Sequence, residues 1–173
     1  MESKVKIAGH GVHPILIVVP LGLLATAVIF DVIQAFNDSG DLAVASFFMI
    51  AAGIIGGLVA ALFGLIDWIA VPAGTRAKRI GAWHGGGNVV VVALFAVSWL
   101  LRLGQDRHAP TALAFVLELV AVVLALGTAW AGGELVERLG VGVDEGAHLD
   151  APSSLSGPVT GRAGARLDQT VEP

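Results

Sequence analysis

Two histidines, His13 and His84, are the side chains of this sequence best suited to chemistry, because each stands at the start of a long apolar run. Imidazole is the commonest metal ligand in proteins. If both runs are membrane helices, the two rings lie at one level near one membrane surface. Asp67 closes another apolar run, and Asn88 follows His84 by one helical turn, so we expect both at the same level.

This pattern allows two kinds of site. Histidines on separate helices can supply the two axial ligands of a haem b iron, with Asp67 or Asn88 orienting a ring nitrogen. With His10 and Asp67 they could instead hold a small metal ion. The glycines 85–87 would let a flat macrocycle approach the backbone. In the structural alternative, the imidazoles only cap helices and the glycines only pack them.

A second polar group, Asp31, Arg102 and Glu118, is expected on the opposite side of the membrane. Glu118 lies eight residues after Pro110, which places it about 12 Å into its helix at a rise of 1.5 Å per residue. Ionisable groups in membrane helices are costly and face the interior, where they often mark function. They also serve as interhelical glue, so a structural partnership with Arg102 is the main alternative.

Composition explains why a membrane is the expected solvent. Of the 173 residues, 55% are apolar and only 14% are charged, against about 25% in ordinary soluble domains. The mean hydropathy is +0.82. The net charge of −4 leaves no basic patch for nucleic acid, and the absence of cysteine excludes disulfides and thiolate metal sites within this sequence.

The apolar runs predict an all-α fold, an antiparallel four-helix transmembrane bundle with a disordered C-terminal tail. Pro20 is expected to kink the first helix, which should be retained and not cleaved because its apolar run continues past a signal-like Ala25-Thr26-Ala27. The expected parts are an N-terminal segment at 1–13, a membrane domain at 14–144 with helices at about 14–36, 42–71, 83–102 and 110–139, and a tail at 145–173.

Small residues are predicted to line the inward faces. In the second helix, Gly53, Gly57, Ala60, Gly64 and Asp67 fall within roughly 80° of arc at 100° per residue. Small residues at this spacing let membrane helices approach closely. Such faces can pack within the chain or against a partner protein.

The distribution of basic residues predicts the orientation. Two basic residues precede the first helix and three follow the second, whereas none lies between the first and second helices. Basic loops stay in the cytoplasm, so both termini are expected there.

Several motifs resemble the bacterial membrane family known as domain of unknown function 2231. They are His13-Pro14, Gly64-Leu65-Ile66-Asp67, His84 with Asn88, Trp130-Ala131-Gly132-Gly133-Glu134-Leu135-Val136 and Gly140-Val141-Gly142-Val143. The resemblance covers about residues 10 to 155 and implies a four-helix protein of the bacterial plasma membrane. Some relatives are fused to Rieske-type or c-type cytochrome domains, which implies a redox partner.

These observations support two functional hypotheses. The first is a redox-associated membrane subunit, not an enzyme on its own, that binds haem b or a metal ion near His13 and His84 and works with a redox protein or another membrane subunit. The second is a non-catalytic scaffold that packs through its small-residue faces. A transporter or proton path ranks third, because four short helices without an evident internal repeat leave little room for alternating access.

Overall fold

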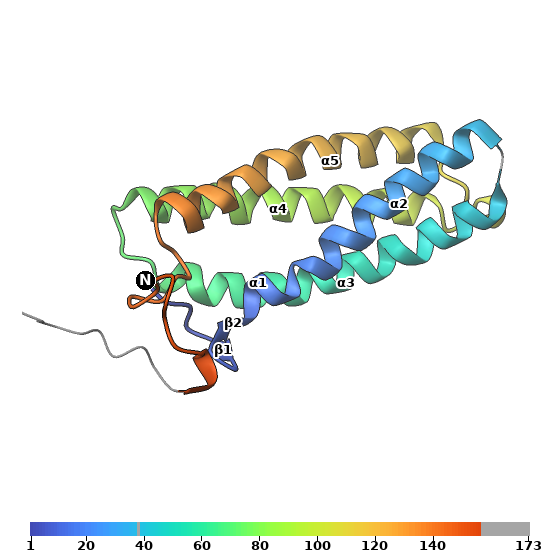
Figure 1. The fold of residues 1–173 in the computed structure, drawn as a ribbon. Helices are drawn as coiled ribbons and strands as arrows, with labels where there is room; N and C mark the ends of the chain where they lie inside the picture. Colours follow the sequence, from blue (N-terminus) through green and yellow to red (C-terminus); the bar gives the residue numbers. More distant parts are fainter. Residues whose placement is uncertain (38, 157–173) are drawn as a thin grey trace, which may run out of the picture.

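The computed structural model describes residues 1–37 and 39–156, which form an antiparallel bundle of long helices (Figure 1). Four helical segments are long and apolar enough to cross a membrane, which confirms the expected fold class. In chain order the elements are β1 (Lys6–Ile7), β2 (His10–Gly11), α1 (Val12–Leu16), α2 (Val18–Asn37), α3 (Gly40–Ala70), α4 (Arg76–Leu101), the 3-10 turn η1 (Asp106–His108), α5 (Ala112–Gly133), the π-helical turn η2 (Glu134–Arg138) and the 3-10 turn η3 (Ser154–Ser156).

Large apolar side chains cover the outside of the bundle, one example from each long helix being Ile29, Leu62, Val89 and Leu126. A water-soluble protein rarely exposes apolar patches larger than a few hundred Å². The fully buried positions instead include acidic, basic and serine side chains, together with several alanines. This inverted distribution is what a bilayer solvent favours.

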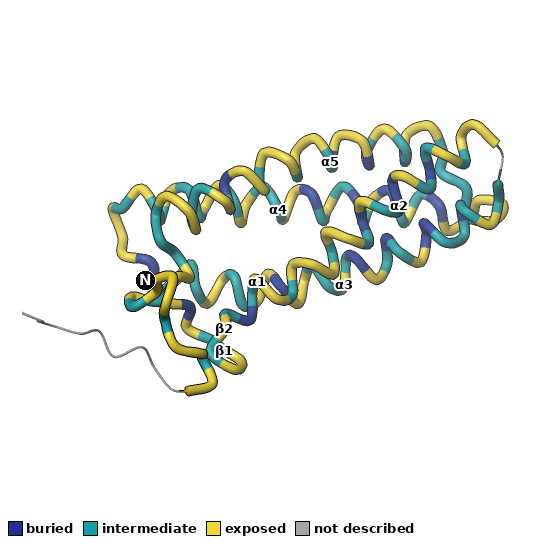
Figure 2. Tube along the Cα trace, in the orientation of Figure 1, coloured by how far each residue is buried: buried dark blue, intermediate teal, exposed yellow. Residues whose placement is uncertain are grey.

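The bundle consists of two helical hairpins. α2 packs on α3, and α4 packs on α5, with α3 and α4 joining the two pairs. The pairs converge at the end that carries residues 39 and 102–111, here called the loop end. They separate toward the end that carries residues 1–13, 71–75 and 139–156, here called the terminal end (Figure 1). Buried residues gather mainly in the half near the loop end (Figure 2).

The first transmembrane segment is broken at Ile17, between α1 and α2. Pro20 has no N–H to donate to the carbonyl of Leu16, and its ring clashes with that carbonyl, so α1 ends there. The chain continues because the Ile17 amide donates to His13 O and the Leu21 amide donates to Ile17 O, each at 3.1 Å. The expected kink is therefore present, and His13 belongs to the short helix before it.

Helix α4 begins at Arg76, earlier than the expected start at residue 83. The Thr75 hydroxyl accepts a hydrogen bond from the Lys78 amide at 3.1 Å, which is the geometry of an N-cap. Lys78 donates to the carbonyl of Trp68 at 2.7 Å and lies 3.9 Å from its ring centroid. The expected start at residue 83 is too late, because the capping threonine starts the helix before the basic residues 76–79.

The N-terminus folds back onto the segment that follows α5. β1 and β2 form a small antiparallel hairpin that the sequence analysis did not anticipate. The Met1 ammonium group donates to Gly140 O, and the Gly142 amide donates to Met1 O, both at 2.8 Å. Ser154 Oγ donates to Ala8 O at 2.9 Å. Of the predicted disordered tail, residues 145–156 are described and mostly irregular, whereas 157–173 lie outside the described residues.

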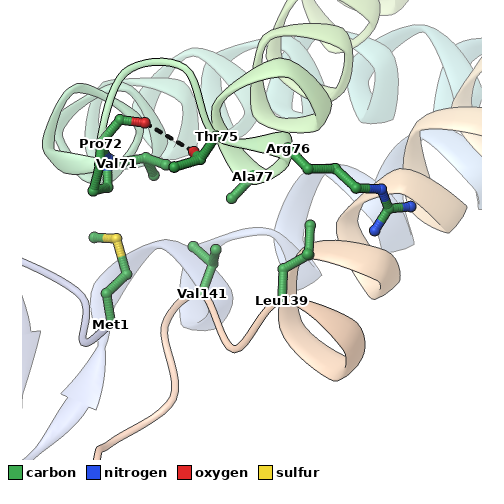
Figure 3. Close-up of a pocket in the computed structure, with 8 residues that line it drawn as sticks. All are labelled: Met1, Val71, Pro72, Thr75, Arg76, Ala77, Leu139 and Val141. Carbon is green, nitrogen blue, oxygen red and sulfur yellow. Dashed lines mark hydrogen bonds between the residues drawn. The ribbon is translucent and has the colours of Figure 1, made fainter.

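A mainly apolar pocket of about 310 Å³ lies where the terminal segments meet the loop before α4. In the close-up, the Met1 side chain points toward Val71 and Pro72, with Leu139 and Val141 beside it (Figure 3). Its walls come from both ends of the described chain and from the central loop, so they tie these segments into one cap. The lining residues are Met1, Val71, Pro72, Thr75, Arg76, Ala77, Leu139 and Val141.

An ion triad stabilises this cap and makes it sensitive to pH. The Lys6 ammonium group bonds to Asp144 and to Glu2, and these bonds, the one to Asp144 first, raise the pKa of Lys6. The bond from Lys6 lowers the pKa of Glu2. A lowered carboxyl pKa gives stability that is lost as the pH falls through the folded value, and a raised lysine pKa gives stability that is lost as the pH rises through it.

We therefore expect the cap to hold from about pH 5 to about pH 10 and to loosen only at a pH below the ordinary glutamate pKa of about 4.3, because the pKa of Glu2 is lowered. Hydrogen exchange at the Gly142 and Val12 amides, both bonded to the N-terminal segment, measures this. Lys6→Ala is the control, since the protection of these amides, taken relative to the intrinsic exchange rate at each pH, should be low and nearly independent of pH in this range. Equal protection of wild type and Lys6→Ala would contradict the prediction.

Candidate functional site

His13 is fixed between α1 and α3. Its Nδ1 lies 2.9 Å from the carbonyl oxygen of Ala60. A carbonyl only accepts hydrogen bonds, so Nδ1 carries the proton and the Nε2 lone pair is free. The ring lies against the α3 backbone at Gly64, where an added Cβ would come within 2.9 Å of the ring atom Cε1. The glycine therefore makes room for the imidazole.

His84 is fixed in the same way between α4 and α5. Its Nδ1 lies 2.8 Å from the carbonyl oxygen of Thr128. A Cβ added at Gly132 would come within 3.0 Å of its Cε1. Each hairpin thus holds a half-buried histidine with one carbonyl and one glycine four residues apart on the second helix.

The two imidazoles lie close together, one held by each hairpin. Their ring centroids are 6.4 Å apart, and their planes stand at 89°. A metal at about 2.0–2.1 Å from each of two opposed ring nitrogens would separate the ring centroids by about 6 Å. Since both Nδ1 atoms are engaged by carbonyls, Nε2 is the atom that each ring could offer to a metal, and at His84 the metal would replace a contact with the Asn88 amide nitrogen at 3.4 Å. The spacing and the tautomers fit one metal centre shared by both hairpins.

Asn88 lies beside this pair, as the sequence predicts. Its amide nitrogen donates to His84 O at 2.8 Å and lies 3.4 Å from His84 Nε2. Its amide oxygen accepts a hydrogen bond from Thr128 Oγ1 at 3.1 Å. Asn88 therefore braces α4 against α5 at the level of His84 and places a donor near the nitrogen that would bind a metal.

Asp67 and His10 do not join the pair. Asp67 accepts a hydrogen bond from the Lys4 amide at 2.6 Å, and His10 contacts Ala8 O at 3.1 Å within the exposed hairpin. Within residues 1–37 and 39–156, no three His, Asp or Glu side chains are grouped closely enough to hold a metal ion. The structure does not bring the expected small-ion set together, because the N-terminal segment bonds to Asp67 and holds His10 in the exposed hairpin.

The glycines that contact the histidines are Gly64 and Gly132, not the triplet 85–87 that the sequence analysis emphasised. Gly87 packs against Thr128, and Gly85 and Gly86 face open space. The triplet therefore serves the α4–α5 contact and the surface. The useful signal in the sequence was the position of Gly64 on the same face as Asp67.

A second polar cluster lies at the loop end, and every side chain in it is fully buried. Arg102 donates from Nη1 and Nη2 to the two carboxylate oxygens of Asp31, at 2.8 and 3.0 Å. It also donates to Ser46 Oγ at 2.6 Å, to Ala43 O at 3.1 Å and to Glu118 Oε1 at 3.1 Å. The structure brings Asp31, Arg102 and Glu118 together in this cluster.

The loop after α4 supplies a further hydrogen-bond acceptor for Arg102. Its Nε donates to His108 O at 2.8 Å. Arg107 and His108 have φ values of 48° and 55°, in the left-handed region that costs non-glycine residues about 1–2 kcal/mol each. The strained turn directs the His108 carbonyl at the guanidinium group. All three nitrogens of that group then donate to protein acceptors within the described residues, which leaves none of them for a further ligand.

Comparison with known proteins agrees with this architecture. The chain matches a family model described as a predicted membrane protein (DUF2231) over residues 9–145. The chain belongs to the DUF2231 family. Neither a curated protein nor a solved structure matches it. Membership confirms the resemblance carried by the sequence motifs and shows a membrane protein, and it assigns no activity.

The DUF2231 chain has an internal repeat that was not evident from its sequence. His84 follows His13 by 71 residues, and Arg102 follows Asp31 by the same 71 residues. On the second helix of each hairpin, Thr128 follows Ala60 and Gly132 follows Gly64 by 68 residues. The two hairpins therefore place matching contacts at matching positions.

Because the chain does contain a repeat, the lack of an evident internal repeat no longer argues against a transporter. The repeat also relates His13 to His84. The two first helices, α1–α2 and α4, run in the same direction, so the repeat is parallel. A ligand bound equally by His13 and His84 of the DUF2231 bundle would lie on the axis relating its two halves. The ion pair between Asp31 and Arg102 joins equivalent positions of opposite charge.

Proposed function

We propose that the protein is a membrane-embedded electron-transfer subunit in which His13 and His84 would hold one b-type haem. The observation that carries this proposal is the pair of neighbouring imidazoles, 6.4 Å apart between ring centroids, each with Nδ1 held by a backbone carbonyl. When bound, the haem would supply reversible one-electron chemistry within the bilayer.

The residues of the chain have definite roles in this proposal. The Ala60 and Thr128 carbonyls fix the tautomer and the orientation of the His13 and His84 imidazole rings. Gly64 and Gly132 have no side chain, so each imidazole ring can lie close to the second helix of its own hairpin. Because the hairpins separate toward the terminal end, one ring would contact each side of the haem. A metal ion without a macrocycle is less favoured, because these two histidines have no third His, Asp or Glu near them in the described part of the chain.

A single redox centre needs a donor and an acceptor outside the chain. We therefore include a partner in the proposal, either a separate redox protein or another membrane subunit. The implication from relatives with fused Rieske-type or c-type domains points the same way. The protein is then an electron carrier and not an enzyme on its own.

The deciding experiment is to produce the full chain with haem available, purify it in mild detergent and record oxidised and reduced absorption spectra with a metal analysis. We expect one haem per chain and a reduced b-type spectrum. Protein that is colourless, metal-free and not reconstituted by added haem would refute the proposal.

A scaffold is the second candidate, and one groove favours it. The groove has a volume of about 390 Å³ between α4 and α5, and the exposed Trp83 and Trp130 line it together with Gly87 and Gly127. A partner helix could pack against such a small-residue surface. The small-residue face of α3 is less suited to this role, since Gly53 packs on Leu24 and Gly56 packs on Val19 within the chain. Colourless protein would favour this candidate.

We also propose that the protein resides in the bacterial plasma membrane with its terminal end in the cytoplasm, following the distribution of basic residues. In otherwise cysteine-free protein, Ser39→Cys and Asp106→Cys should react with a membrane-impermeant thiol reagent added to intact cells. Ala73→Cys, at the terminal end, should react only after the cells are opened. Reaction of Ala73→Cys in intact cells, with the other two protected, would reverse the orientation.

A further inference from the structure

We propose that Glu118 is a proton-binding site in the loop-end half of the membrane domain, and that the buried cluster holds one exchangeable proton on this carboxyl group. The inference concerns the end of the bundle opposite to the histidine pair and does not depend on haem binding. It rests on the charge balance of the cluster and on one unpartnered oxygen.

The charge balance requires a proton or another cation. Arg102 supplies one positive charge, and Asp31 and Glu118 supply two negative charges if both are ionised. All three side chains have zero exposed surface. A net negative charge buried at membrane depth carries a solvation penalty of several kcal/mol. A neutral cluster with one protonated carboxyl group avoids this penalty.

The hydrogen bonds identify Asp31 as the ionised carboxylate. Its two oxygens both accept from the Arg102 guanidinium group, which is the fork-to-fork arrangement of a strong ion pair. Asp31 Oδ1 also accepts from Ser46 Oγ at 2.5 Å. A proton on either oxygen would displace a charged donor, so Asp31 is not the place for it.

Glu118 is bonded through only one of its oxygens. Oε1 accepts from Ser98 Oγ at 2.5 Å and from Arg102 Nη1 at 3.1 Å. Oε2 is buried and has no hydrogen-bond partner within the described residues. An ionised oxygen without a donor is costly in such a setting, whereas a carboxylic O–H neutralises the group. Oε2 is therefore the atom that carries the proton.

The surroundings of Glu118 supply few competing charges. α2 contributes Asp31, α3 contributes Ser46 and the Ala43 carbonyl, and α4 contributes Ser98 and Arg102. Asp41 and Arg107 at the same end pair with each other near the surface. Hence Arg102 is the one cation that Glu118 contacts among the described residues, and Asp31 already shares it.

His108 offers a connection from this cluster toward the loop end. Its carbonyl accepts from Arg102, its Nδ1 lies 3.2 Å from Arg102 O, and its ring stacks on Phe47 with centroids 4.0 Å apart. The His108 side chain is only partly buried. Proton exchange between Glu118 and the aqueous phase should therefore occur from the loop end, past the strained turn that His108 closes.

Infrared spectroscopy of the full chain in lipid nanodiscs tests the proposal directly. At neutral pH exposed carboxyl groups are ionised, so a C=O stretch of a protonated carboxyl group should come from the cluster. We expect one such band in wild type, shifted in heavy water, lost in a single step as the pH is raised, and absent from Glu118→Gln. Absence of the band in wild type at neutral pH would overturn the proposal without any variant.

Two variants assign the band. Glu118→Gln keeps the size of the side chain and the acceptor for Ser98 while removing the titratable group, so it should fold and melt within a few degrees of wild type. Ser98→Ala, a neighbour of the same carboxyl group, should keep the band at a shifted frequency. A band that persists in Glu118→Gln would assign the proton to Asp31 and refute the proposal. Loss of folding in Glu118→Gln alone would show that the ionised form is required, which also refutes it.

Discussion

Arg102→Leu is expected to lower the free energy of unfolding in detergent by about 3–5 kcal/mol, the cost typical of removing one partner from a buried ion pair. The guanidinium group donates to two carboxyl groups, one hydroxyl group and two backbone carbonyls drawn from four elements. Its loss leaves Asp31 buried without a counter-charge. Chemical unfolding followed by tryptophan fluorescence measures the change.

Arg107→Ala is the matched control for this substitution. Arg107 also pairs with an aspartate at the same end of the bundle, Asp41, but both side chains are more than half exposed. Exposed ion pairs are worth about 0–1 kcal/mol. If Arg102→Leu costs no more than Arg107→Ala, the buried cluster does not hold the hairpins together.

A double substitution separates the ion pair from the packing. Asp31→Leu combined with Arg102→Leu removes both charges, and exchanging a buried pair for apolar residues is often neutral or stabilising. We expect the double variant to be more stable than Arg102→Leu alone. The difference measures the penalty of the unpaired carboxylate and not the strength of the pair itself.

The transmembrane helices were predictable because the bilayer imposes length and apolarity on them. Their ends were not, because caps decide them locally. Thr75 bonds to the Lys78 amide and so starts α4 before the basic residues, which by composition look like a loop. The kink at Pro20 was predicted correctly. The helix is interrupted at Ile17, because the Leu16 carbonyl has no N–H donor at Pro20.

The polar faces were predictable to the level of single residues. Helical periodicity placed His13, His84 and Asn88 together, and it placed Asp31, Arg102 and Glu118 in the opposite half. Periodicity along one helix says nothing about a segment that folds back from elsewhere. The N-terminal segment 1–11 contacts Asp67 because the Lys4 amide donates a hydrogen bond to its carboxylate, and the two residues are 63 positions apart in the sequence.

The internal repeat was hidden because equivalent positions differ in residue type. Asp31 and Arg102 occupy matching positions with opposite charge, and Ala60 and Thr128 both contribute only a backbone carbonyl. A carbonyl is supplied by any residue, so no sequence signal marks it. Among the groups that hold the histidines and the buried ion pair, only the two histidines and their glycines keep the same residue type at matching positions.

Loss of haem from both His13→Ala and His84→Ala is the sharpest expectation of the proposed function. Removing a group that merely orients a ligand typically weakens metal affinity by about 10–100-fold, and removing the ligand itself should cost at least as much. We therefore expect haem content after purification to fall at least about tenfold in each variant. The reduced b-type spectrum and the haem-to-protein ratio are the measurements.

His10→Ala and His148→Ala are the controls, because both side chains are exposed and lie outside the pair. Gly64→Ala gives a finer test: its Cβ would crowd the His13 ring without removing the ligand, so haem should be retained more weakly and with an altered spectrum. If His10→Ala removes haem as well as His13→Ala does, the ligand assignment is wrong. If all four histidine variants retain haem equally, the haem lies elsewhere and the facing imidazoles are only hydrogen-bonded braces between the helices of each hairpin.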